Sequence, residues 1–211
     1  MAVGLVRPSS GEVLHFAEDP SITIFVPHVA ATARDTQPYV WAVDFDQAPS
    51  YWFPRDCPRV LTWASANTTT LDRERFLGAS SRVHALEYAW LDRLLSTVLY
   101  AYRFDKSQFM PYGTPEPHAY VSTATVRPLH PPEQVGPLLD AHAATGIELR
   151  LLRNLWPYWS QVMPSTLGFS GIRLRNAQPE EVTLNVEPIR EEHWSNLSAA
   201  RGTCTRIPYL R

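Results

Sequence analysis

Three residues in the first part of the chain have the types and spacing to bind a flat ring. His15 follows a short apolar run and precedes an acidic turn in HFAEDPSI. Trp41 lies on an expected strand, and Tyr51 follows the next polar turn. Two such aromatic side chains can hold a ring between them, since stacked rings gain about 0.5–1.5 kcal/mol beyond area burial. The alternatives are a buried histidine bonded to the backbone and aromatic rings that belong to the core.

The segment FPRDCPRV supplies further candidates directly after this expected ring site. Arg55 and Arg59 could hold a pyrophosphate through bidentate hydrogen bonds. The alternative is a surface pair of Arg55 with Asp56, or a turn fixed by Asp56, which would contribute little. Cys57 would have a lowered thiol pKa beside these arginines and could be nucleophilic. Because no histidine–acid set is identifiable around it, a catalytic thiol is the weaker interpretation.

Short segments rich in β-branched and aromatic residues predict the strands that would position these groups. We expect strands at 12–16, 39–44, 59–64, 118–126, 147–152 and 170–177, with two more inside 82–105 around a short helix. Helices are expected at 69–79, 131–146 and 155–162. The first two begin at a capping threonine or at a proline and end at a glycine. This order predicts a strand-rich mixed α+β domain with short connecting helices.

Length and composition limit the class of protein. The 211 residues suit one globular domain at 1–177, followed by an extension or arm at 178–211. A formal net charge of −2 provides no basic field for nucleic acid. The sequence shows no signal peptide, membrane span, disulfide framework or metal-ligand spacing. We therefore expect a cytoplasmic protein with a small-molecule ligand, no membrane or metal partner, and a homodimer as one possible assembly.

The histidine of LHF, followed by VWAVDFDQAPSYW, resembles the start of the ADP-ribosyltransferase fold. That group includes diphtheria-type toxins, poly-ADP-ribose polymerases and RNA 2′-phosphotransferases. The resemblance implies an ADP-ribosyltransferase-like fold and NAD as the ligand. It also implies that His15 contacts the NAD ribose while Trp41 and Tyr51 clamp nicotinamide. Trp41 departs from the tyrosine that is usual at its position.

The same resemblance leaves the catalytic glutamate of the transferases without a counterpart. That glutamate opens a late strand and stabilises an oxocarbenium-like transition state, and the matching stretch PHAYVST has Ala119 there. Glu116 or Glu148 could supply a carboxylate instead, although either could be an ordinary surface acid. The expected function is therefore nucleotide- or NAD-related binding. The alternatives are a non-enzymatic accessory protein, for small-molecule biosynthesis or protein interaction, and a hydrolase or transferase that uses an unassigned acid.

Longer motifs resemble an uncharacterised family of bacterial proteins over most of the chain. They are HFAEDPSI, YWFPRDCPRV, GIELRLL and FSGIRLRNA, and they bring no function with them. The last two contain Arg150, Arg173 and Arg175 on expected strands with alternating apolar residues. These arginines are expected on solvated polar faces, or alternatively along one anion-binding cleft.

Overall fold

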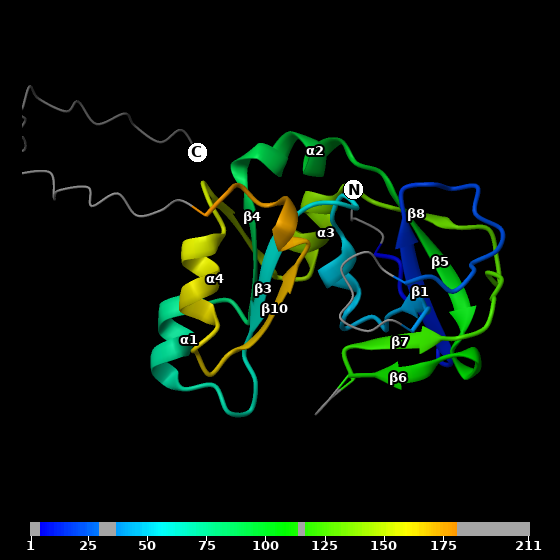
Figure 1. Ribbon diagram of the computed structural model, residues 1–211, viewed down its shortest axis with the longest axis horizontal. Coiled ribbons are helices and arrows are strands. Elements are labelled where there is room, and N and C mark those ends of the chain that lie inside the picture. Colours follow the sequence, from blue (N-terminus) through cyan, green and yellow to red (C-terminus); the bar gives the residue numbers. More distant parts are fainter. Residues whose placement is uncertain (1–4, 30–36, 114–116, 181–211) are drawn as a thin grey trace, which may run out of the picture. The chain divides into compact units, whose positions relative to one another are not determined.

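The structure is a computed structural model that describes residues 5–29, 37–113 and 117–180 (Figure 1). Within these residues, ten strands form three small sheets and are connected by four α-helices and short 3-10 turns. The expected α+β class is therefore confirmed. One compact unit extends to Pro179. Most of the predicted arm at 178–211 lies outside the described residues, so the arm remains a prediction.

The largest sheet has four strands and is covered by helices on both faces. Its order is β10 (Gly168–Ile172), β3 (Arg59–Trp63), β4 (Arg82–Glu87) and β9 (Glu148–Leu152). One face packs on α1 (Thr70–Phe76) and α4 (Trp156–Val162), and the other on α2 (Leu91–Ser96) and α3 (Leu138–Ala144) (Figure 1). Alternation along the strands supplies both faces: Val83 packs with Phe76 and Val162, whereas Leu86 packs with Leu94 and Leu138.

Two three-stranded sheets complete the unit. One has the order β1 (Glu12–Ala17), β5 (Leu99–Asp105) and β8 (Glu133–Val135), and the other β2 (Val40–Ala42), β7 (Ala119–Ser122) and β6 (Met110–Tyr112). The 3-10 turns are Ala48–Tyr51, Tyr88–Trp90, Lys106–Gln108 and Leu174–Asn176. An antiparallel bridge between Leu14 and Val43 joins the two sheets, so His15 lies beside the strand that carries Trp41.

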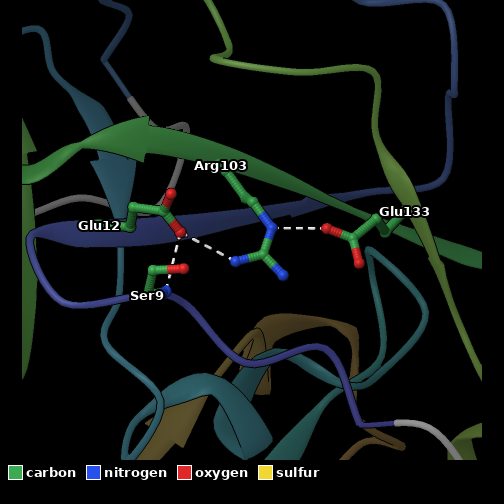
Figure 2. Close-up of polar contacts among 4 residues, drawn as sticks. All are labelled: Ser9, Glu12, Arg103 and Glu133. Atoms are coloured by element: carbon green, nitrogen blue, oxygen red, sulfur yellow. Dashed lines mark hydrogen bonds and ion pairs between the residues drawn. The ribbon is translucent and has the colours of Figure 1, made fainter.

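A polar network links the start of β1 to the other two strands of its sheet. Arg103 on β5 donates from Nη1 to Glu12 at 2.8 Å and from Nε to Glu133 at the start of β8 (Figure 2). The same carboxylate oxygen of Glu12 accepts the backbone N–H of Ser9 at 2.8 Å. Arg103 and Glu12 are mostly shielded from water, which favours this pairing over an ordinary surface ion pair. The network thereby helps to hold the β1 register in which His15 lies opposite Tyr102.

Two predicted elements are wrong in part. The segment 131–146 was expected to be one helix, but it forms β8 and then α3, because Gly136 and Pro137 separate the two halves. The segment 170–177 was expected to be one strand. It leaves the sheet after Ile172, where Arg173 turns into the left-handed region and a 3-10 turn follows.

Candidate functional site

A cavity of about 640 Å³ lies among segments of all three sheets and the loops between them. Its lining includes all five residues predicted to bind a ligand: His15, Trp41, Tyr51, Arg55 and Arg59. They come from β1, β2, the 3-10 turn after β2, the following loop and the start of β3. The volume lies in the range of about 300–1,000 Å³ that is typical of small-molecule pockets.

His15 presents an acceptor to this cavity. Its Nδ1 lies 2.7 Å from the carbonyl oxygen of Trp41, which can only accept, so the proton must be on Nδ1. Burial is the main cause that lowers the pKa of His15, and the charges of His28 and Arg55 lower it further. The ring is therefore neutral at pH 7, and its Nε2 has no hydrogen-bond partner among the described residues. Both sequence interpretations apply to this residue, because His15 is bonded to the backbone and also lines the cavity.

Arg59 places a buried positive charge at the cavity wall. The residue is 4% exposed and donates from Nε to the Ser50 carbonyl and from Nη1 to the Cys57 carbonyl, each at 3.0 Å. Its guanidinium lies 4.8 Å from the ring centre of Phe53. No carboxylate pairs with it in the described part of the chain. Burial lowers the pKa of Arg59 to about 10, so it remains charged at neutral pH.

The two predicted ring residues form separate parts of the cavity wall. Trp41 and Tyr51 are both partly buried, and no ring contact joins them within the described ranges. Trp41 is held at 4.9 Å from the ring of Tyr112, in an edge-to-face contact. Burial raises the pKa of Tyr51, whose hydroxyl is therefore a neutral donor at pH 7. Both rings thus border the same cavity.

The sequence reasoning missed part of the lining. Phe25, His28, Tyr112 and His118 also face the cavity, but they lie on loops and a short strand whose position depends on tertiary packing. Arg173 was considered for an anion-binding cleft with Arg150 and Arg175, and only Arg173 of these three lines the cavity. Its left-handed turn could not be inferred from alternation along an expected strand.

The predicted acids are not brought into this cavity by the described structure. Glu148 lies outside its lining, and its carboxylate accepts from Arg150 Nε at 2.6 Å and from Ser80 Oγ at 3.0 Å. The hydrogen bond from Arg150 is the main cause that lowers the pKa of Glu148. Glu116 lies outside the described residues. The one carboxylate residue in the described lining is Glu18, which accepts the backbone N–H of Arg55 at 2.8 Å.

Two other positions differ from their expected chemistry. Cys57 is fully buried, and burial raises its pKa to about 12 in spite of nearby Arg59, so the thiol is not an activated nucleophile. Ala119, aligned with the transferase glutamate, is also fully buried and packs in the core outside the cavity lining. A carboxylate at this position would therefore enter the apolar core.

The described residues contain neither a metal-ligand cluster nor a membrane-spanning helix. No group of three or more His, Cys, Asp or Glu side chains there could hold a metal ion. No helix in the same ranges is long and apolar enough to cross a membrane.

Comparison with known proteins identifies a family without assigning an activity. No curated protein and no solved structure gave a significant match. The match to the family of unknown function DUF6886 covers residues 14–177 and therefore includes the motifs quoted above and all of the described cavity lining. The prediction of an uncharacterised family is thus confirmed, and the chain belongs to the family of unknown function DUF6886.

Proposed function

We propose that the cavity binds a nucleotide-like small molecule, with NAD as one candidate. The observation that carries this proposal is the charge of Arg59, which is buried at the cavity wall and has no carboxylate partner among the described residues. A buried guanidinium is costly unless it is paired, and two backbone carbonyls offset only part of that cost. An anionic group of a ligand would complete the pairing and gain charge-assisted hydrogen bonds.

The remaining lining favours an anion joined to a ring and a sugar-like polar group. Trp41 and Tyr51 offer aromatic surfaces. The Nε2 of neutral His15, which has no partner in the described part of the chain, can accept from a hydroxyl or amide of the ligand. The described lining contains three arginines and one glutamate, namely Arg55, Arg59, Arg173 and Glu18. Three positive charges against one negative charge in this lining favour an anionic ligand.

Binding can be tested by calorimetry and thermal unfolding with adenosine, AMP, ADP, ADP-ribose and NAD. We expect the phosphorylated compounds to bind and adenosine to bind more weakly. A ligand present at 100 times its dissociation constant should add about 2.7 kcal/mol to stability. Failure of all phosphorylated compounds to bind would overturn the proposal.

Two variants test the assigned anion site. Arg59→Met should weaken AMP and ADP binding by about ten- to a hundredfold, the usual worth of a hydrogen bond to a charged group. Arg75→Gln is the matched control, because Arg75 is exposed on α1 and lies outside the cavity lining. Equal affinities in wild type and folded Arg59→Met would contradict the role given to Arg59.

A further inference from the structure

Arg59 and Arg173 bring two positive charges together from distant parts of the sequence. Strand β10 pairs antiparallel with β3 so that Ile172 lies opposite Arg59, and Arg173 follows directly. Both arginines line the cavity, and the charge of Arg173 contributes to lowering the pKa of Arg59. Two guanidinium groups that repel one another in this way form a favourable arrangement once an anion lies between or beside them.

The backbone at Arg173 is held in an unusual conformation. Its φ of 56° and ψ of 25° lie in the left-handed region, and it is the one non-glycine residue with positive φ among those described. This conformation costs roughly 1–2 kcal/mol for an L-residue and persists where the surroundings enforce it. Strain of this kind gathers at ligand clamps, so its occurrence at a cavity wall is relevant to binding.

The loops that carry the two arginines are also fixed to one another. Asn176 donates from Nδ2 to the backbone carbonyl of Asp56 at 2.8 Å, which joins the turn after β10 to the FPRDCPRV segment. The side chain of Asp56 lies 3.9 Å from Arg173 Nη1, too far for a good hydrogen bond. Asp56 is half exposed, so a ligand anion can replace this loose pairing at small cost.

The two arginines differ in depth and in the number of donors that they offer. Arg59 is almost fully buried and uses its Nε–H and one N–H of Nη1 for backbone carbonyls, which leaves Nη2 and the second N–H of Nη1 for an anion. The side chain of Arg173 is 24% exposed. Its guanidinium approaches the Asp56 carboxylate only to the ion-pair distance of 3.9 Å and is not hydrogen-bonded to it. The inner arginine therefore suits one phosphate group, and the outer arginine is available to a second phosphate nearer the solvent.

We infer that Arg59 and Arg173 form two adjoining anion subsites that select a diphosphate over a monophosphate. This inference rests on the proposed nucleotide binding and adds the chemical class of the ligand. The inner phosphate contacts Arg59, and the outer phosphate replaces Asp56 as the partner of Arg173. A monophosphate occupies the inner subsite alone.

The test compares AMP with ADP by calorimetry at one pH and one salt concentration. ADP should bind wild-type protein about tenfold more tightly or better, because its second phosphate gains a hydrogen bond to a charged group. Arg173→Gln should reduce ADP affinity to near that of AMP and leave AMP binding almost unchanged. Arg127→Gln is the charge-matched control, because Arg127 is exposed and lies outside the cavity lining.

A second variant tests the same inference in the opposite direction. Asp56→Asn removes the competing carboxylate, while the backbone carbonyl that accepts from Asn176 remains. ADP binding should tighten severalfold and AMP binding should not change. Equal affinities of wild type for AMP and ADP, or an equal loss of both in folded Arg173→Gln, would overturn the diphosphate inference and leave nucleotide binding in place. Absence of binding by both nucleotides would overturn the two proposals together.

Discussion

Trp41 and Trp52 lie in the same stretch of sequence but differ in their surroundings. Trp41 is partly buried at the cavity, whereas Trp52 is 1% exposed within the core. Trp41→Ala should weaken binding of a ring-bearing ligand by about tenfold, since stacking of a base on an aromatic ring contributes about 1–3 kcal/mol. Its loss of stability should remain below the roughly 3–5 kcal/mol expected for a fully buried ring.

Ligand titration and urea unfolding of the two alanine variants separate these roles. Trp52→Ala is the control that should lose stability because its ring packs in the core beside His142. If Trp41→Ala keeps full affinity and loses as much stability as Trp52→Ala, Trp41 is a core residue and not a ligand contact.

Two buried histidines lead us to expect that the folded protein loses stability at low pH. His142 donates from Nδ1 to the Leu138 carbonyl at 2.7 Å, so its Nε2 accepts from Nδ1 of His84 at 3.2 Å. The remaining Nε2 of His84 is buried without a partner in the described structure. Burial lowers the pKa of His142 to about 4 and that of His84 well below its usual value. Both rings are therefore neutral in the folded protein at pH 7.

The sign of the pH effect follows from these lowered values. Below pH 6.5 the unfolded chain takes up protons that the folded protein does not, so stability falls as the pH decreases toward 4. His142 alone should contribute about 3 kcal/mol to this loss, at 1.36 kcal/mol for each pKa unit. Urea unfolding between pH 4 and 8 measures the effect, and His142→Gln should flatten the curve. An unchanged slope in that variant would contradict the assignment.

At the scale of elements, Gly113 holds the end of β6 against His118. Its φ is +114°, and an added Cβ would lie 2.1 Å from Nδ1 of His118. Gly113→Ala should therefore displace the His118 ring from the cavity, weaken ligand binding and cost on the order of 1–3 kcal/mol through backbone strain. Gly146→Ala is the control, because Gly146 also has positive φ but nothing within 4 Å of its added Cβ.

Unfolding and ligand titration of both glycine variants distinguish strain from the contact with His118. Both should lose stability, and only Gly113→Ala should lose affinity. Equal affinity in the two variants would show that His118 does not contribute to the binding surface.

The elements that the sequence predicted well are those whose pattern is set locally. Thr69 caps α1 by accepting from the N–H of Asp72, and Gly78 ends that segment in the left-handed region, as their residue types indicate. Alternation in the segment 82–105 correctly indicated strand, short helix and strand. The segment 131–146 was predicted wrongly because its apolar residues fit one helical stripe. In the structure Pro137 precedes α3, and the residues before it form the strand β8.

The residues of the candidate site differ in the same respect: a local pattern predicts some of them, and tertiary packing places the others. Trp41, Tyr51, Arg55 and Arg59 are close in sequence, and the passage from β2 to β3 brings them to the cavity. His15 joins them from β1 through the bridge between Leu14 and Val43. The positions of Arg173 and His118 depend on which strands pair, and pairing partners are not encoded in a local pattern. Only the folded structure therefore shows that Arg173 and His118 line the cavity.

At the scale of the whole molecule, the described residues lead us to expect ligand binding without NAD hydrolysis. Catalysis by a transferase of the ADP-ribosyl class depends on a carboxylate that stabilises a developing cationic sugar. Ala119 is buried away from the cavity, Glu148 is paired with Arg150 outside it, and Glu18 is bonded to a backbone N–H. The arginines at the cavity wall would also oppose a cationic transition state. NAD should therefore bind and remain intact.

Incubation with NAD, followed by NMR or liquid chromatography of free nicotinamide, tests this expectation at substrate concentrations that saturate binding. Nicotinamide release should equal that of a buffer control, and Arg59→Met should not change it. NAD turnover well above the control would contradict the conclusion that no carboxylate in the cavity is available for catalysis. Glu18→Gln and Glu116→Gln would then identify the acid, because each removes charge while preserving shape. Loss of turnover in only the first would assign the reaction to the hydrogen-bonded glutamate in the described cavity wall, and loss in only the second to the 114–116 segment.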